Sequence, residues 1–375
     1  MKVIIVMPLA EQRGGGELML THLMQQGLQR GIEWYVVFLE DGPMVDQFQQ
    51  MGIGAYVIPS GRLRTPHKSL SCVRQLSALL RRERAEVVLS WMSKAQLYGG
   101  PAARMAKVPA LWYQVYVPAR YSWLDRVATL LPAVGVITLS KAGSQAQAGI
   151  WPHRPVRLVH PGAELERFDP ARLPSPMAVR QRLGLPAEGP LVGIVGRLQR
   201  WKGMHTLVQA LPSILKAYPR GHAVLVGGKH DLEPDYPDFL AKQVRDLGLN
   251  DKVIMTGLQR NIPEWMQALD VVVHASDREP FGIVIIEAMA LGKPVIAGAE
   301  GGPVEIITQG VDGLLTPFED ANALADAVLR LLDDTEYARR LGEVARQRAR
   351  EFSTQRYAEN LIAAVIDLVG SAKCV

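Results

Sequence analysis

Short, continuous apolar runs recur along the chain and are separated by longer amphipathic stretches. Such runs, in which Val, Ile and Leu fill consecutive positions, are typical of strands buried on both faces. They cover residues 2–8, 33–40, 54–59, 85–92, 110–117, 135–140, 191–196, 222–228, 252–257, 271–276, 294–298 and 312–317. Helical patterns lie between them, for example at residues 17–31 and 72–84, and residues 320–370 are helical almost throughout. The alternation predicts parallel sheets covered by helices, and therefore an α/β fold class.

The pattern restarts once, which predicts two doubly wound domains. A chain of 375 residues is also longer than one typical hydrophobic core supports. Residues 168–189 are rich in proline and polar residues, so we predict a linker there between domains at 1–167 and 190–354. Ligands of such sheets bind beyond the carboxyl ends of the strands, so we expect the ligand-binding residues to follow the strands directly.

Composition excludes several classes of protein. A hydrophobic content of 48% describes a globular chain, and two distant cysteines, Cys72 and Cys374, favour neither a disulfide framework nor a zinc site. We therefore expect a cytoplasmic location. We expect no signal peptide, because the short apolar segment at residues 3–10 is followed at once by "EQRGGGELML", a pattern typical of a strand, a glycine loop and a helix. No apolar run approaches the ~20 residues that span a bilayer.

Charge is distributed unevenly. Residues 1–167 contain 19 Lys and Arg against 11 Asp and Glu, a net charge of +8, whereas the remainder has a net charge of −3. A basic N-terminal half suits an anionic partner such as a membrane surface, a phosphorylated lipid or nucleic acid. The cluster at residues 62–85 contributes much of this charge, and a merely solvated helix face explains it equally well. Aromatic residues are not interleaved with the cluster, so we expect no specific nucleic-acid binding.

Two glycine-rich segments follow predicted strands and precede helices. Gly14, Gly15 and Gly16 do not have the G-x-G-x-x-G spacing of a dinucleotide site, but they allow a phosphate to approach the backbone closely. Gly301 and Gly302 precede a short helix that contains Glu305. Both segments are candidate cradles for an anion.

Two further segments carry charged side chains. Arg197 and Lys202 follow the strand at 191–196, where two cations could hold a diphosphate or could simply be exposed on the surface. Glu279 lies just before a helix predicted at 281–291. Glu287 lies on the apolar face of that helix, where a carboxylate is costly to bury without hydrogen-bond donors. Either a ligand or nearby backbone amides could supply those donors.

We expect no metal site. The acidic segment at residues 230–238 matches no hard-cation loop and is interpreted as a polar connection. His22 lies among leucines and methionines on the first predicted helix, so packing is a better explanation for it than catalysis.

Five motifs in this order resemble the retaining glycosyltransferases of family 4, which have two Rossmann-like domains in the GT-B arrangement facing a central cleft. The motifs are "GGGE" at 14–17, "VGRLQRWKG" at 195–203, "EPFGIVIIE" at 279–287, "GGPVEI" at 301–306 and "GVDGLLTP" at 310–317. The resemblance covers essentially the full length. It implies that residues 355–375 form a helix that packs back on the N-terminal domain.

The resemblance also implies roles for individual residues. Arg197 and Lys202 would bind the donor diphosphate, Glu279 would contact hydroxyls of the donor sugar, and Glu287 would accept hydrogen bonds from the ribose. Arg197, Lys202 and Glu279 would be catalytic. The implied donor-binding set is Gly15, Gly16, Arg197, Lys202, Glu279, Phe281, Gly282, Ile283 and Glu287. Gly257, Leu258 and Ile262 would lie near the nucleobase, and Glu17 and Gln114 on the acceptor side.

The chain departs from the family pattern at one position. Many members have a histidine at the end of the strand that corresponds to residues 110–117, where this chain has Gln114 and Val115. Gln114 could replace it as a hydrogen-bonding group but not as a base. Retaining transfer in this family is thought to need no protein base, because the leaving phosphate can accept the acceptor's proton.

The resulting hypothesis is a metal-independent retaining glycosyltransferase without a cofactor. It would move a sugar from a UDP- or GDP-sugar to a glycan or lipid-linked acceptor in cell-envelope polysaccharide, glycolipid or exopolysaccharide synthesis. The protein would be cytoplasmic and peripheral on the inner face of the membrane. A catalytically silent nucleotide-sugar binding subunit and a GT-B nucleotide-sugar epimerase remain alternatives.

Overall fold

The computed structural model describes residues 1–12, 14–27, 31–61, 66–118 and 123–373. The chain divides into two compact units, one formed by Met1–Gly162 with Thr354–Val375 and the other by Ala163–Ser353. Each unit contains one parallel sheet, so the α/β fold class predicted from the apolar runs is confirmed. Among the described helices, none is both long and apolar enough to cross a bilayer.

The first sheet has the strand order β3-β2-β1-β4-β5-β6-β7. Six of its strands lie in the predicted apolar runs. The seventh, β7, was missed because it has only three residues and two of them are exposed. The strands are β1 (Lys2–Met7), β2 (Glu33–Phe38), β3 (Gly54–Val57), β4 (Val87–Trp91), β5 (Ala110–Gln114), β6 (Gly135–Thr138) and β7 (Val156–Leu158).

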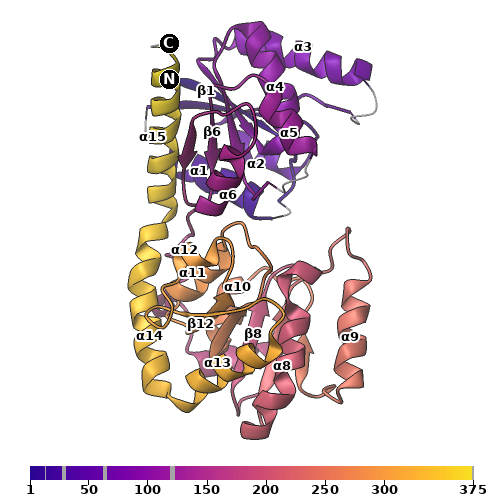
Figure 1. The fold of residues 1–375 in the computed structure, drawn as a ribbon, viewed down its shortest axis with the longest axis vertical. Coiled ribbons are helices and arrows are strands. Elements are labelled where there is room, and N and C mark those ends of the chain that lie inside the picture. Colours follow the sequence, from indigo (N-terminus) through magenta and orange to yellow (C-terminus); the bar gives the residue numbers. More distant parts are fainter. Residues whose placement is uncertain (13, 28–30, 62–65, 119–122, 374–375) are drawn as a thin grey trace. The chain divides into compact units, whose positions relative to one another are not determined.

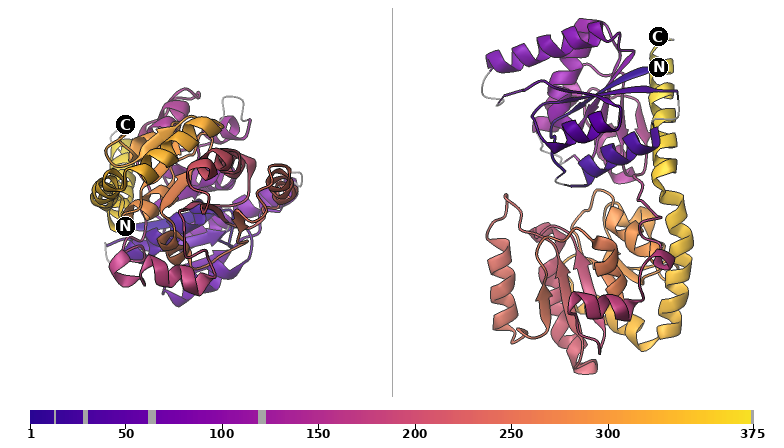
Figure 2. Two further views of the ribbon diagram at one scale, coloured as in Figure 1. Left: turned by 90° about the horizontal axis from the view of Figure 1, so that it is seen from below. Right: turned by 180° about the vertical axis from the view of Figure 1, so that it is seen from behind.

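Helices cover both faces of this sheet (Figure 1). α3, α4 and α5 pack in a row, and Leu76 of α3 and Tyr98 of α4 are buried with Val88 of β4 in one core. On the other side α15 packs against α1, although the two helices come from opposite ends of the chain (Figure 2). The helices are α1 (Gly15–Gly27), α2 (Pro43–Gln50), α3 (Pro66–Arg82), α4 (Met92–Ala106), α5 (Trp123–Leu130), α6 (Lys141–Ala148) and α15 (Thr354–Lys373).

The second sheet has the order β10-β9-β8-β11-β12-β13, and all of its strands lie in predicted apolar runs. Its strands are β8 (Leu191–Val195), β9 (His222–Val226), β10 (Val253–Met255), β11 (Val271–His274), β12 (Val295–Gly298) and β13 (Leu314–Thr316). Its helices are η1 (Pro170–Arg172), α7 (Pro176–Leu183), η2 (Arg200–Lys202), α8 (Met204–Ala217), α9 (Tyr236–Asp246), α10 (Ile262–Ala268), α11 (Ile283–Ala290), α12 (Pro303–Ile306), α13 (Ala321–Asp333), α14 (Thr335–Ala349) and η3 (Arg350–Phe352).

Residues 168–189 are not a separate linker, because they lie inside the second unit and contribute η1 and α7 to it. The proline at the start of α7 is compatible with the first helical turn, and the Ser175 hydroxyl caps the helix by accepting the Ala178 N–H. Gly184, in the left-handed conformation, ends the helix. The boundary between the units therefore follows Gly162 rather than residue 167.

The second sheet reverses its direction of growth next to β8. The chain runs outward from β8 to β9 and β10, and then returns to place β11 on the other side of β8. The loops after β8 and β11 therefore begin at the same sheet edge but lead to helices on opposite sides. This is the switch point at which doubly wound sheets bind ligands.

Gly203 allows these two loops to touch. Its φ of 70° favours glycine, and a Cβ atom there would lie 2.0 Å from the carbonyl oxygen of Ala275, just after β11. Behind this contact the Asp277 N–H donates to the Trp201 carbonyl oxygen at 2.7 Å. The backbone of one loop thus fixes the other.

Gly203→Ala should therefore destabilise the second unit more than Gly184→Ala. Both glycines have a left-handed φ, which costs alanine about 1–2 kcal/mol, but only Gly203 has backbone within reach of the added methyl group. Overpacking should bring the loss at residue 203 to roughly 2–5 kcal/mol. Urea unfolding of both variants measures the difference, and equal losses would contradict the close approach.

Candidate functional site

A buried ion pair lies at the switch point of the second sheet. Lys202, in η2 after β8, and Glu279, in the loop after β11, are joined by a contact of 2.5 Å between Nζ and Oε2. Both side chains are largely buried, and the Lys202 ammonium also lies 3.9 Å from the centre of the Trp201 ring. A lysine and a glutamate that are 77 residues apart in sequence are thus brought together by neighbouring strands.

His274, the last residue of β11, is a second partner of Glu279. Its Nε2 lies 3.3 Å from the same Oε2 atom, and its side chain is buried. Burial alone would raise the pKa of Glu279, but the Lys202 charge and the His274 hydrogen bond hold that pKa well below its usual range. Glu279 is therefore an ionised carboxylate throughout the physiological pH range.

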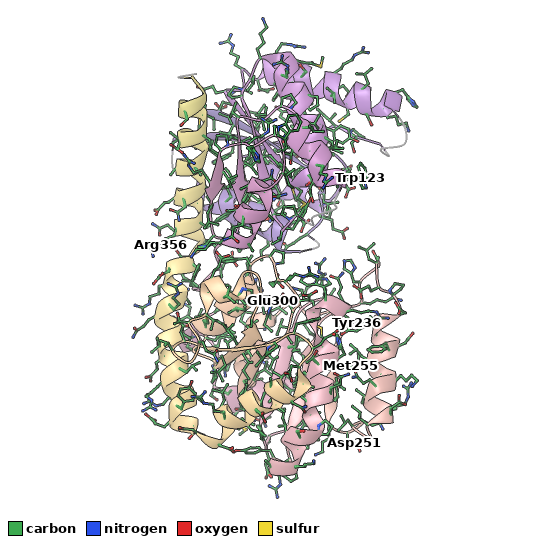
Figure 3. All side chains as sticks on the ribbon, in the orientation of Figure 1. Trp123, Tyr236, Asp251, Met255, Glu300 and Arg356 are labelled. Carbon is green, nitrogen blue, oxygen red and sulfur yellow. The ribbon has the colours of Figure 1, made fainter. Side chains whose placement is uncertain are left out.

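Glycines bring a third loop onto Glu279. Gly301 and Gly302 follow β12, and the Gly302 N–H donates to the Glu279 carbonyl oxygen at 2.7 Å. A Cβ atom on Gly301 would lie 2.3 Å from that oxygen, and one on Gly302 would lie 2.1 Å from the Cα of Phe281. Side chains here would separate the loops, so the glycines are required by packing as well as being a candidate anion cradle. Figure 3 labels Glu300 in this loop.

Glu287 has a different environment. It lies in the second turn of α11, which begins at Ile283 rather than at Phe281 as predicted, after Gly282 in a left-handed conformation. Its carboxylate is half-buried and makes no hydrogen bond to any residue that the structure describes. Burial raises its pKa to about 8, with a smaller opposing effect from Arg167. The alternative explanation from the sequence, a carboxylate that caps backbone amides, therefore finds no support.

Arg197 follows β8 directly, as predicted, and contacts His230, the first residue of the acidic segment at 230–238. Its Nη1 lies 3.1 Å from Nε2 of His230, in the loop after β9. Lys202 and Arg197 thus have separate partners, Glu279 and His230, and both flank the carboxyl end of β8. The two cations remain a predicted diphosphate site.

The residues expected near the nucleobase lie at the carboxyl end of β10. Gly257 has a left-handed φ of 69°, Leu258 is 80% exposed, and Ile262 opens α10. Leu258 also lies against Gly228, in the loop after β9. An exposed leucine beside glycine backbone is a surface on which a flat apolar ring can pack.

The remaining predicted residues belong to the first unit. Gly15 and Gly16 form the first turn of α1, so this helix begins earlier than predicted, and Glu17 is buried beside them. The Cε of Met92 lies 2.3 Å from where a Cβ of residue 16 would be, and a Val115 methyl carbon lies 3.5 Å from it. The position at which the resemblance implies a histidine is therefore occupied by an apolar side chain, Val115, close to Gly16.

Gln114 ends β5 and is fully buried. Neither its amide nitrogen nor its amide oxygen finds a hydrogen-bond partner among the described residues. His22 is buried as well, as packing predicts. No group of three His, Cys, Asp or Glu side chains suited to a metal ion occurs in the described part of the chain.

The structure thus brings Lys202, Glu279 and the Gly301–Gly302 loop together in the second unit and places Arg197 at the same sheet edge. It leaves Gly15, Gly16, Glu17 and Gln114 in the first unit. Sequence reasoning missed His274 and His230. His274 gave one weak signal, a polar residue that closes the run of three valines before Glu279.

Comparisons with known proteins show what the chain is similar to. The family model described as "Glycosyl transferases group 1" matches residues 178–348, which include both members of the ion pair. This segment, somewhat less than half of the chain, is therefore similar to the glycosyl transferases group 1 family. A "D-inositol 3-phosphate glycosyltransferase" of Corynebacterium urealyticum is 35% identical over 213 residues, which are 55% of this chain and 50% of that protein. The chain spans about half the length of the curated relatives that it matches.

Solved structures extend the likeness beyond this family segment. Anabaena HepE, solved in complex with UDP-glucose, is 29% identical with a TM-score of 0.84, covering 98% of this chain and 99% of that one. The sucrose-phosphate synthase of Thermosynechococcus elongatus is 25% identical with a TM-score of 0.83, covering 99% of both chains. The predicted GT-B fold class, with two Rossmann-like domains, is therefore confirmed, while the central cleft stays a prediction.

The environment of Glu287 predicts a pH-dependent stability difference between the wild type and Glu287→Gln. With a folded-state pKa of about 8 against an ordinary 4.5, the native protein retains a proton that the unfolded chain has released. The contribution of Glu287 to the free energy of unfolding should therefore fall as pH rises from 4.5 to 8, by a few kcal/mol at most. Over the same range the stability of Glu287→Gln should rise relative to that of the wild type. Urea unfolding across this range tests the prediction, and parallel curves would contradict it.

Proposed function

We propose that this protein is a retaining glycosyltransferase that moves a sugar from a UDP- or GDP-sugar to an acceptor hydroxyl. The observation that carries the proposal is the buried Lys202–Glu279 pair at the switch point of a glycosyl transferases group 1 segment. The likeness to HepE, whose structure contains UDP-glucose, supports a nucleotide-sugar donor.

In this proposal the cations of the second unit bind the donor diphosphate. Arg197 and Lys202 neutralise the negative charge that develops as the nucleoside diphosphate leaves. Stabilisation of developing charge by preorganised groups is usually the largest single contribution to the rate enhancement. The bond between the sugar C1 and the diphosphate oxygen breaks, and a bond from C1 to the acceptor oxygen forms on the same face. The acceptor proton goes to the leaving diphosphate, so no protein base, metal or cofactor is required.

The carboxylates bind the hydroxyl groups of the donor. Glu279, ionised at every physiological pH, accepts hydrogen bonds from the sugar hydroxyls, beside the backbone of Phe281, Gly282 and Ile283. Glu287 has an unused carboxyl group, for which the two ribose hydroxyls supply partners. Leu258, with Gly257 and Ile262, provides an apolar surface for the base.

The first unit would bind the acceptor, a glycan or a lipid-linked sugar, with Gly15, Gly16, Glu17 and Gln114 at the acceptor side. Gln114 supports this role because its buried amide is unsatisfied within the described chain. We propose cell-envelope polysaccharide, glycolipid or exopolysaccharide synthesis as the setting, with the protein on the inner face of the membrane.

A basic helical layer supports the membrane setting. Residues 66–118 and 123–131, which contain α3, α4 and α5, hold nine Lys and Arg against three Asp and Glu. Asp125 is buried, so the outer surface is even more positive than this count. On α3, Leu76 and Leu80 face the core while Lys68 and Arg74 are exposed, so this helix presents cations that an anionic membrane surface attracts.

Exposed apolar side chains accompany this charge. Trp123 and Leu130 of α5 share one helix face with Val127, and Trp123 is 65% exposed (Figure 3). Between α5 and α6 lies a hollow of about 740 Å³, whose lining includes Leu130, Arg126 and Trp151, the last 70% exposed. Tryptophans beside arginine favour the headgroup region of a bilayer.

Charge reversal on α3 should weaken binding to vesicles that contain phosphatidylglycerol. Each cation near an anionic surface contributes about 1 kcal/mol, so Lys68→Glu with Arg74→Glu should reduce binding by at least roughly tenfold. Trp123→Ser with Trp151→Ser should also weaken it, because the apolar contact is lost. Flotation assays measure both effects.

Lys216→Glu and Leu232→Ser, at exposed positions of the second unit, are the matched controls and should bind as the wild type does. Equal binding of the wild type to neutral and anionic vesicles, or no binding to either, would overturn the membrane assignment without affecting the proposed reaction.

Nucleotide release from a panel of UDP- and GDP-sugars tests the reaction itself. We expect turnover of one donor, a loss of roughly 100-fold or more in Lys202→Ala, where a charge stabiliser is missing, and a comparable loss in Glu279→Ala. Retention of anomeric configuration, read by NMR of the product, tests the stereochemistry.

Two outcomes would favour the alternatives. Tight donor binding without release, with or without acceptor, would indicate a catalytically silent nucleotide-sugar binding subunit, in which Val115 in place of the family histidine explains the missing turnover. Conversion of the donor sugar to its epimer without any acceptor would indicate a GT-B nucleotide-sugar epimerase.

A further inference from the structure

Glu279 shares one carboxylate oxygen between two partners. Oε2 contacts the Lys202 ammonium at 2.5 Å and Nε2 of His274 at 3.3 Å. Only Lys202 can leave easily, because its ammonium ends a flexible four-carbon stem. His274 is held by the backbone of β11, where it pairs with Ala297 of β12, and its ring is buried.

The proposed function gives Lys202 a second anion to bind. A donor diphosphate that attracts its ammonium competes directly with Glu279, because the carboxylate and the phosphate oxygens seek the same charge. Once Lys202 turns away, a buried carboxylate remains without its ion-pair partner, which is strongly unfavourable. Donor binding therefore needs a group that compensates Glu279 at that moment.

We propose that His274 is this positioning residue: its Nε2–H keeps hold of Oε2 when Lys202 moves to the diphosphate, so that Glu279 stays oriented toward the sugar hydroxyls. The inference rests on the proposed function.

The surroundings of the imidazole favour this role. Nδ1 is buried and has no hydrogen-bond partner among the described residues, so the hydrogen-bonding capacity of the ring is directed through Nε2. The other contact of Nε2 is with the Ser276 hydroxyl at 3.5 Å, which is longer than the contact with Glu279. Of the two polar partners of this nitrogen, the carboxylate of Glu279 is thus the nearer one.

The proposal predicts opposite effects of two substitutions, at His274 and at Glu279, on the affinity for a free nucleoside diphosphate. In wild type, the diphosphate must draw Lys202 away from Glu279, and His274 lowers the cost of doing so. His274→Leu should therefore weaken nucleoside diphosphate binding by about tenfold to hundredfold, the range for one hydrogen bond to a charged group. Glu279→Gln should instead tighten it, because Lys202 is then unpaired before the nucleotide arrives.

Double-mutant analysis isolates the interaction. Calorimetry with UDP and GDP would be run on wild type, His274→Leu, Glu279→Gln and the double variant. We expect His274→Leu to have little effect in the Glu279→Gln background, because no buried carboxylate remains to be held. His274→Gln, which can donate an amide N–H at a similar reach, should restore binding and donor turnover, whereas the shorter His274→Asn should not.

His222→Leu is the matched control, because it removes a partly buried histidine from the opposite end of a strand in the same sheet. It should bind nucleotide as wild type does. If His274→Leu does not fold, the comparison between His274→Asn and His274→Gln carries the test. An equal loss in both Glu279 backgrounds, or no loss at all, would overturn the role of His274. Absence of nucleotide binding to wild type would instead overturn the proposed function.

Discussion

The Lys202–Glu279 ion pair depends on two strands that are neighbours in space and distant in sequence. β8 and β11 pair directly, and each sends a loop from the same sheet edge. Gly203 allows the loops to meet, and the Asp277–Trp201 backbone hydrogen bond fixes them. A buried ion pair tolerates little error in its geometry, because each charge has given up its water. Without this sheet topology and the glycines of the second unit, Lys202 and Glu279 would not lie close enough to form the ion pair.

The two glutamates of this site have opposite electrostatic environments. Glu279 meets a cation and a hydrogen-bond donor, which keep it ionised, whereas Glu287 meets mainly desolvation, which keeps it protonated near neutral pH. One group is thus a constant acceptor, and the other can change between donor and acceptor as its surroundings change. Pairs of carboxyl groups driven apart in pKa are a common way for a site to divide its roles.

Much of this architecture could be predicted because buried parallel strands have continuous apolar runs, and because glycines and charged residues directly after strands mark the ligand-binding edge. The segment containing α7 was misread because proline suggests a linker, although it is also compatible with a first helical turn. His274 was overlooked for a different reason. A histidine at the end of a run of valines is predicted to be a buried strand residue. Only the three-dimensional structure shows that it contacts the carboxylate of Glu279, five residues later in the chain. The partners of Arg197 and Lys202 depend on loop geometry, which sequence spacing does not determine.

The helix α15 completes a unit that begins at the other end of the chain. Residues 354–373 are synthesised after the whole second unit, yet α15 packs on α1 in the first. During translation the first unit therefore keeps an uncovered apolar surface until α15 has been synthesised. The second unit is one continuous segment and is completed before that point. Removal of α15 would expose the surface of α1 that it covers. A C-terminal truncation should therefore lower the stability of the N-terminal unit before that of the second unit.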